Sequence, residues 1–269
     1  MRPGTNEVIS GAYDSGVGIF DVASDTFCML GYHDHLTNRV VVSPDGKRAA
    51  SCSSDYSIRL WDLERRTLSR VLRGHSDDVE DFVFVNDYIG VSASRDRRIL
   101  TWDLRTGAIV SIFDDHEKDV LSLAYHEGRL FSSGDDKTLR IWNLAEGVLE
   151  RTIGPFDVET DTCDIDPARG RVVLGCDDGV IRIFDVNTGE LERAIEGHTS
   201  GIKKVAISDE GHILSAAYDQ QIIIWDRDTL KKRQTLQGVK HKWERSFAFA
   251  DGGRSVVAGT FDGTLVKWD

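Results

Sequence analysis

Residues 74–103, GHSDDVEDFVFVNDYIGVSASRDRRILTWD, form the unit on which the rest of this chain is patterned. The unit begins with a Gly-His pair, continues through two short apolar runs at 82–85 and 89–93, and closes on Trp102-Asp103. Short apolar runs separated by turn residues predict β-strands rather than helices. The stretch therefore indicates a small antiparallel sheet.

The unit recurs along the whole chain. An aromatic residue followed by Asp or Asn closes each copy, and an Asp lies six residues before each aromatic. Successive closing aromatics are 41, 41, 40, 42, 41 and 43 residues apart. The closing pairs are Phe20-Asp21, Trp61-Asp62, Trp102-Asp103, Trp142-Asn143, Phe184-Asp185, Trp225-Asp226 and Trp268-Asp269. Such a period accommodates four strands of about 5–6 residues with their turns, which predicts a four-stranded antiparallel sheet per copy.

This joint spacing of Gly-His and Trp-Asp resembles the WD-repeat family of β-propellers. The resemblance covers all 269 residues. It implies an all-β fold, a single domain over residues 1–269 that forms a seven-bladed β-propeller of four-stranded antiparallel blades. Aligning Phe20 with Trp102 leaves the first copy without most of its innermost strand, and nothing follows Asp269 to make the last outer strand. We therefore expect incomplete first and last blades, with about half a repeat lacking for ring closure.

The charge balance narrows the choice of partner. The chain carries 33 Lys and Arg against 45 Asp and Glu, a net charge of −12. This charge opposes binding to nucleic acid or to an anionic membrane and favours a basic partner. The first residues contain no apolar leader segment, and the four cysteines form no C-x-x-C pair. We expect a cytoplasmic protein that binds neither nucleic acid nor membrane.

Ser92, His75 and Asp96 imitate a catalytic triad within one copy. A catalytic triad is expected once, in a cleft, whereas this trio recurs in three further copies. The other sets are His33, Ser51 and Asp55; His116, Ser132 and Asp136; and His198, Ser215 and Asp219. The family resemblance implies that each trio and its Trp form a hydrogen-bond network inside a blade. We expect scaffolding rather than catalysis, and no motif predicts a cofactor or a metal.

Three copies depart from this pattern, namely the first, the last and the copy that ends at Phe184. The copy that ends at Phe184 has Leu174 in place of Ser and Gly154-Pro155-Phe156 in place of Gly-His. Such copies cannot complete the network. We expect them to be held by apolar packing and strand pairing, and to be the softer part of the ring.

The family resemblance further implies that partners dock on the top face, at three loop positions of each blade. Carried over residue by residue, these positions give an acidic group and a group rich in aromatic and basic residues. The acidic group comprises Asp78, Glu80, Arg95, Asp119, Asp135 and Asp177, and the second group comprises Tyr13, Lys203, Tyr218, Trp243, Arg245 and Phe261. Aromatic residues beside Arg are typical of binding hot spots, and acids steer a basic segment.

We therefore expect a non-enzymatic scaffold that holds a protein or peptide segment on its top face. Two alternatives stay open. One is a sensor or autoinhibitory domain of a larger multidomain protein, in contact with other domains of a longer chain. The other is a propeller enzyme with its active site at the channel mouth. An enzyme would need unrepeated polar residues that converge there, and the unrepeated histidines His35, His126, His212 and His241 are scattered along the chain.

Overall fold

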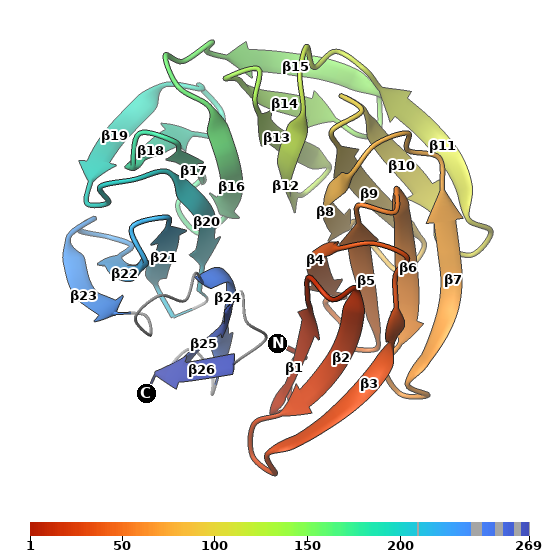
Figure 1. Cartoon of the computed structure of the whole chain (residues 1–269). Helices are drawn as coiled ribbons and strands as arrows, with labels where there is room; N and C mark the ends of the chain where they lie inside the picture. The colour runs from red at the N-terminus through yellow and green to blue at the C-terminus, as the bar shows by residue number, and fades with distance from the viewer. Residues whose placement is uncertain (209, 238–243, 251–254, 261–264, 269) are drawn as a thin grey trace. The chain divides into compact units, whose positions relative to one another are not determined.

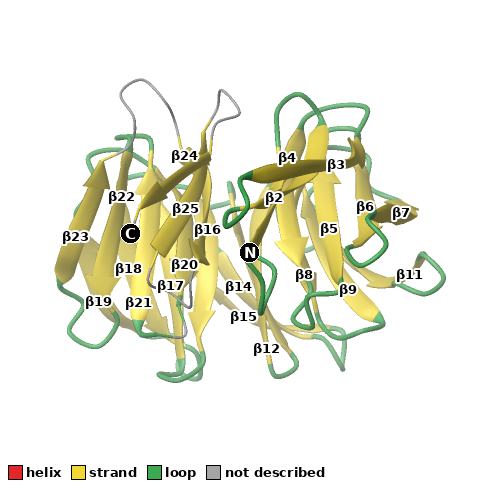
Figure 2. Ribbon diagram, turned by 90° about the horizontal axis from the view of Figure 1, so that it is seen from below, coloured by secondary structure: helices red, strands yellow, loops and turns green. Residues whose placement is uncertain are grey.

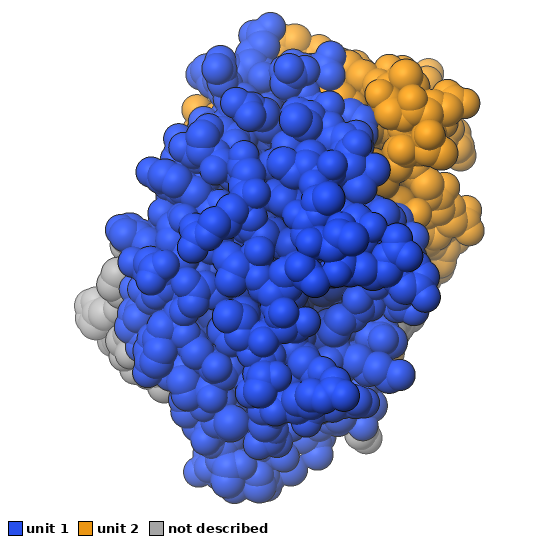
Figure 3. Space-filling model, turned by 90° about the vertical axis from the view of Figure 1, so that its right-hand side faces the viewer, with its two compact units in different colours: residues 1–120 blue, residues 121–269 orange. Residues whose placement is uncertain are grey.

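The computed structural model describes residues 1–208, 210–237, 244–250, 255–260 and 265–268 (Figure 1). Every regular element in this part of the chain is a β-strand. The chain divides into two compact units, residues 1–120 and residues 121–269, which are blue and orange in Figure 3. We refer to them as unit 1 and unit 2 and describe each by itself.

Unit 1 contains three antiparallel sheets in which spatial order follows chain order. The first has three strands, β1 (Glu7–Gly11), β2 (Gly16–Asp21) and β3 (Thr26–Tyr32). The second comprises β4 (Thr37–Val42), β5 (Arg48–Ser53), β6 (Ser57–Asp62) and β7 (Thr67–Arg73). The third comprises β8 (Val79–Phe84), β9 (Ile89–Ser94), β10 (Ile99–Asp103) and β11 (Ala108–Phe113).

Unit 2 continues the pattern from β12, which begins at the last residue of unit 1. Its first two sheets are β12 (Val120–His126), β13 (Arg129–Gly134), β14 (Leu139–Asn143) and β15 (Val148–Ile153), and β16 (Thr160–Asp166), β17 (Arg171–Cys176), β18 (Val180–Asp185) and β19 (Leu191–Glu196). The next comprises β20 (Ile202–Ile207), β21 (His212–Ala217), β22 (Gln221–Asp226) and β23 (Lys232–Gln237). Three described strands form the last, β24 (Glu244–Ala250), β25 (Ser255–Thr260) and β26 (Leu265–Trp268).

The predicted all-β fold with four-stranded antiparallel blades is confirmed by the five four-stranded sheets in the described residues. The first and last sheets have three strands each in the same residues, at the two copies whose alignment predicted incomplete blades. In six of the seven described sheets the closing aromatic lies near the end of the third strand, as in Trp61 on β6 and Trp102 on β10, and in the first sheet Phe20 lies on the second strand, β2, because the innermost strand is missing there. The 41-residue period thus corresponds to one blade of a β-propeller.

Apolar packing between neighbouring sheets forms the core of each unit. In unit 1, Leu60 and Leu72 of one sheet pack with Phe82, Leu100 and Trp102 of the next. In unit 2, the sheet that begins with β16 packs in the same way against the sheet that begins with β20. The second strands of these sheets are almost wholly buried, as in β5 and β9, whereas the outer strands β7 and β11 are largely exposed.

Loops gather at the two ends of the strands (Figure 2). We define the top loops as those that enter the first strand of a sheet and those that join its second and third strands. The bottom loops join the first to the second strand and the third to the fourth. In an antiparallel sheet these two sets lie at opposite ends, so the top loops of one unit share an end.

Candidate protein-binding loops and the networks beneath them

The predicted network of Trp, Ser, His and Asp is present in unit 1. Ser92 Oγ lies 2.8 Å from Nε1 of Trp102 and 2.7 Å from Nε2 of His75. The other ring nitrogen of His75, Nδ1, lies 2.8 Å from Oδ2 of Asp96. A neutral imidazole with its proton on Nδ1 satisfies every contact, because Ser accepts from Trp and donates to Nε2. The His, Ser and Trp side chains are buried, so the set ties strands and loops together rather than exposing a nucleophile.

The same distances recur in two more sheets. Ser51 Oγ lies 2.8 Å from Nε1 of Trp61 and 2.7 Å from Nε2 of His33, whose Nδ1 lies 2.9 Å from Oδ2 of Asp55. In unit 2, Trp225, Ser215, His198 and Asp219 form the third set, with contacts of 2.7 to 2.9 Å. Trp142 and Ser132 share the corresponding 2.8 Å contact on β14 and β13. The repeated trio is therefore part of the blade architecture.

Burial and hydrogen bonding set the charge states in these networks. Burial lowers the pKa of His33 and of His198 and outweighs the neighbouring carboxylate, which acts in the opposite direction. Burial alone would raise the pKa of Asp55, but hydrogen bonds from Ser57, from the backbone of Asp34 and from His33 hold it below its usual range. A neutral imidazole beside an ionised carboxylate fits both these contacts and the directions of the pKa shifts.

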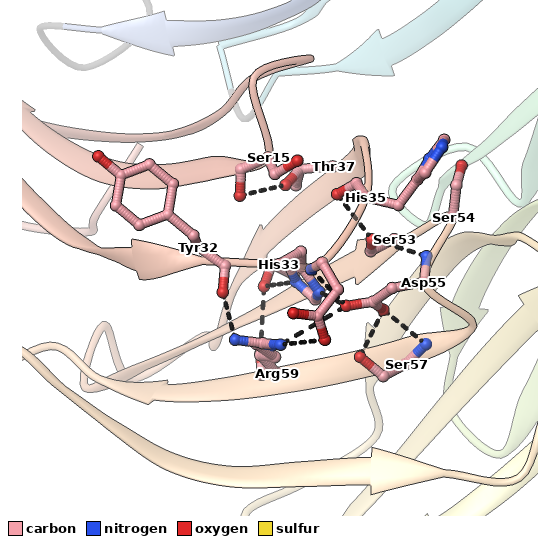
Figure 4. A network of polar contacts seen from close by, with 12 residues as sticks. Ser15, Tyr32, His33, His35, Thr37, Ser53, Ser54, Asp55, Ser57 and Arg59 are labelled. Carbon is pink, nitrogen blue, oxygen red and sulfur yellow. Dashed lines mark hydrogen bonds and ion pairs between the residues drawn. The ribbon is translucent and has the colours of Figure 1, made fainter.

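An arginine four residues after the turn Asp is a further member that the sequence reasoning missed. Arg59 contacts the carbonyl oxygen of Tyr32, lies 3.2 Å from Oδ2 of Asp34 and lies 3.6 Å from Oδ2 of Asp55 (Figure 4). The same spacing gives Asp136 and Arg140 at 3.2 Å, and Asp178 and Arg182 at 2.7 Å. The recurrence of Asp-x-x-x-Arg in three copies was a signal that could have revealed this pair.

The copy that ends at Phe184 replaces the polar network with apolar contact, as the sequence predicted. Leu174 is fully buried where five other copies have Ser, and the rings of Phe156 and Phe184 lie 5.7 Å apart. These side chains belong to one apolar cluster of unit 2. Asp178 lacks a histidine partner here and instead holds Arg182 through both carboxylate oxygens. Removing the whole polar set together leaves no buried donor unpaired, which avoids the largest cost of losing a hydrogen bond.

One backbone hydrogen bond joins the two top loops of four sheets. The N–H of Arg95, which follows β9, donates to the carbonyl of Asp78, which precedes β8, over 2.9 Å. Equivalent bonds link Ser54 to Leu36, Asp177 to Glu159 and Tyr218 to Gly201. In three of these four sheets a buried network also holds the same loops from below, so the candidate binding residues there stand on a fixed backbone.

In unit 1 the top loops and the start of β8 bring one cation among three carboxylates. Arg95 Nε lies 2.5 Å from Oε1 of Glu80 and 4.0 Å from Oδ2 of Asp78, and its Nη1 lies 3.6 Å from Oδ2 of Asp119. Asp78 also accepts from Ser54 Oγ at 2.8 Å. Burial raises the pKa of Glu80, against the effect of Arg95. Four of the predicted site residues therefore lie together, with negative charge in excess.

In unit 2 a second cation lies in a comparable setting. Lys203 Nζ contacts Asp161, lies 3.2 Å from Oδ1 of Asp177 and lies 4.6 Å from the ring centre of Tyr218. Asp161 is largely buried, and burial raises its pKa, whereas the ring of Tyr218 and the carboxylate of Asp177 are exposed. The sequence grouped Lys203 with the aromatic residues, but the structure ties it to two acids as well. Asp161 anchors this cluster, at a position that the repeat alignment also assigns to the top face.

The structure describes some of the remaining predicted site residues and not others. Tyr13 lies in the loop between β1 and β2, which counts as a top loop because these strands correspond to the second and third strands of the other sheets, and Asp135 lies in the top loop after β13; both residues are half-buried. Arg245 lies in β24, where the structure describes the backbone but not this side chain. Trp243 and Phe261 lie outside the described residues. Of the second predicted group, the structure thus describes the side chains of Tyr13, Lys203 and Tyr218.

Comparison with protein families shows which family the chain belongs to. The family described as WD domain, G-beta repeat, matches residues 27–62, 66–103, 107–143 and 189–226, which together exceed half of the chain. The chain belongs to the WD-repeat family. The four matched segments end at the closing pairs of the four copies that contain the His, Ser, Asp and Trp set. None of them covers the copy in which apolar contact replaces this set.

The individual proteins that are similar to this chain are longer than it is. Nuclear distribution protein PAC1 of Arthroderma otae is 30% identical over 237 residues, which cover 82% of this chain and 46% of that protein. The ribosome biogenesis protein WDR12 homolog of Nematostella vectensis is 27% identical over 81% of this chain and 50% of its own length. A p21-activated protein kinase-interacting protein 1-like protein of Xenopus laevis is 30% identical over 43% of this chain and 32% of its own. The chain spans about half the length of the first two relatives.

Within the described residues, no helix has the length and apolar character needed to cross a membrane. Within the same residues, no group of three or more His, Cys, Asp or Glu side chains is arranged to hold a metal ion.

Proposed function

We propose that this WD-repeat chain is a non-enzymatic scaffold whose top loops hold a basic segment of a partner protein. The observation that carries the proposal is the charge of these loops. Arg95 in unit 1 is surrounded by three carboxylates, and Lys203 in unit 2 contacts two. Each cluster therefore has acids in excess, and an incoming Lys or Arg side chain would find carboxylates that are already desolvated in part.

The proposal includes the wider architecture expected from the sequence. Residues 1–269 would form one domain, a seven-bladed propeller with incomplete first and last blades. Five four-stranded and two three-stranded sheets in the described residues support this blade number.

Aromatic side chains would supply the apolar part of the contact. Tyr218 is 41% exposed, and its ring lies beside the ammonium group of Lys203. Tyr and cationic residues at the centre of an interface contribute much of its binding energy. Tyr13, Asp135, Trp243, Arg245 and Phe261 belong to the proposed surface on the strength of their positions in the repeat.

The names of the relatives support a role in protein assemblies. They refer to nuclear distribution, to ribosome biogenesis and to interaction with a protein kinase, and none of them names a reaction. Net negative charge supports a partner other than nucleic acid or an anionic membrane, and we place the protein in the cytoplasm. The greater length of the relatives supports the alternative of a sensor or autoinhibitory module. In that case the partner would be another domain of the same protein.

Crosslinking tests this proposal directly. The tagged chain is used to isolate partners from cells of its source, and the complex is treated with a carbodiimide, which joins carboxylates to lysines at contact distance. The proposal expects crosslinks from the partner's lysines to Asp78, Asp119 or Asp177. Crosslinks confined to bottom-loop acids such as Asp45 and Asp87 would contradict it.

A further inference from the structure

The outer strands of the sheets differ in how they protect their free edge. A strand at the edge of a sheet presents unpaired N–H and C=O groups, and charged side chains normally prevent another strand from pairing there. The outer strands β7, β15, β19 and β23 each contain at least two charged residues. The sequences of β3, TFCMLGY, and β11, AIVSIF, contain none.

β11 presents an apolar ridge at its edge. Ile109, Val110 and Ile112 are 40%, 58% and 52% exposed. Ile109 lies opposite Trp102 and Ile112 opposite Leu100, so the two isoleucines share a face, with Val110 as the extra residue of a β-bulge between them. β10 is the only described strand that pairs with β11. The edge is therefore apolar, exposed and unpaired within the described sheets.

The residues that flank β11 are of opposite charge. Arg105 lies in the bottom loop before the strand with its side chain 65% exposed, and Asp114 and Asp115 follow the strand and are exposed. When two identical strands pair antiparallel about a two-fold axis, the start of each lies beside the end of the other. Arg105 would thus approach Asp114 and Asp115 of the second copy, at both ends of the pair.

β3 lacks this complementarity. Asp25 precedes it and Asp34 follows it, so antiparallel pairing of two copies would place acids beside acids. Like charges across a strand pair are destabilising. Of the two uncharged edges, only β11 has the charge pattern that matches its own reverse.

We propose that β11 is the site at which two copies of this chain associate, by antiparallel pairing of their edge strands into one continuous sheet. In the matching register Ile109 of each copy lies opposite Ile112 of the other, and Val110 lies opposite Ser111. This register places Thr106 opposite Asp115, so that the guanidinium of Arg105 reaches the acidic end of the second copy. The contact is separate from the top loops and leaves them free to bind a partner.

Sedimentation of the purified chain tests the proposal. At about 0.15 M salt, which screens the repulsion between two acidic molecules, the chain should pass from monomer to dimer between about 1 and 100 µM. Val110→Lys and Ile112→Lys should each weaken the dimer at least about tenfold, because a charge on the edge opposes pairing. Val148→Lys is the matched control, since Val148 is 46% exposed on β15, which already contains charged residues. Its dimer constant should equal that of the unmodified chain.

Charge reversal provides the second arm. Arg105→Glu and Asp115→Lys should each weaken the dimer of that variant, and an equimolar mixture of the two should associate as strongly as the unmodified chain, because both ends then have opposite charges. If Arg105 acted only on Asp103 of its own copy, the mixture would not recover the association. A chain that stays monomeric throughout the range, a dimer weakened equally by Val148→Lys, or a mixture no stronger than its components would each overturn the proposal. A monomer whose β11 accepts a strand of another protein counts among these contradicting results.

Discussion

Nε2 of His75 lies 2.7 Å from Oγ of Ser92, at a point where neither side chain reaches solvent. His75 belongs to the loop that enters β8 and Ser92 to β9, so this contact joins a top loop to the second strand of the sheet. The same loops contain Asp78 and Arg95, whose side chains form the acidic cluster. The buried network therefore positions the proposed binding surface, and stability and function are linked through it.

Ser92→Ala tests the energetic role of this network. The substitution leaves the indole N–H of Trp102 and Nε2 of His75 buried without their shared partner. We expect the free energy of unfolding to fall by about 2–3 kcal/mol, measured by urea denaturation. Ser133→Ala is the matched control, because Ser133 is equally buried and its Oγ has no hydrogen-bond partner in the described structure. Equal losses in the two variants would show that the network contributes nothing beyond packing.

The lowered pKa values of His33 and His198 predict acid sensitivity. Unfolding exposes both rings and returns each pKa to about 6.5. The unfolded state therefore binds more protons below that pH, so stability is fully present above about pH 6.5 and declines as the pH falls towards 5. Urea midpoints measured between pH 8 and pH 5 should show this decline. The double variant His33→Gln/His198→Gln should be less stable at pH 8 but show a flatter slope, and an unchanged slope would refute the assignment.

Leu174→Ser tests the apolar substitute for the network. Restoring the serine of the repeat should not restore the network. The side chain of Phe184 has no N–H donor, unlike the indole of Trp, and Phe156 occupies the neighbourhood of the missing imidazole. We expect a loss of about 3–5 kcal/mol in unfolding free energy, from the cavity and from a buried hydroxyl without a partner. Leu174→Met preserves volume and should cost less than about 1.5 kcal/mol. A neutral or stabilising effect of Leu174→Ser would show that this sheet still accommodates the polar set.

The repeated features of the sequence predicted the fold well. The nearly regular spacing of the closing aromatics predicted the strand pattern. Because Ser92 and its partners recur in several copies, the sequence also correctly predicted a structural hydrogen-bond network at these residues. The pairing of side chains between loops was less accessible. Lys203 and Asp161 lie 42 residues apart, and their contact depends on how adjacent sheets pack, which no local pattern encodes. The apolar edge of β11 became significant only when its exposure and lack of a pairing strand were known.

Binding of the isolated partner to two matched double variants tests the central claim most directly. Tyr218→Ala/Asp177→Lys alters the top loops, and Tyr88→Ala/Asp87→Lys alters the bottom loop between β8 and β9. Each pair comprises an exposed tyrosine beside a cation and an ion-paired aspartate, so the two variants make the same chemical changes. By calorimetric titration the top variant should bind at least about 100-fold more weakly than the unmodified chain, and the bottom variant within about threefold of it. A larger loss in the bottom variant, or equal losses in both, would contradict the account.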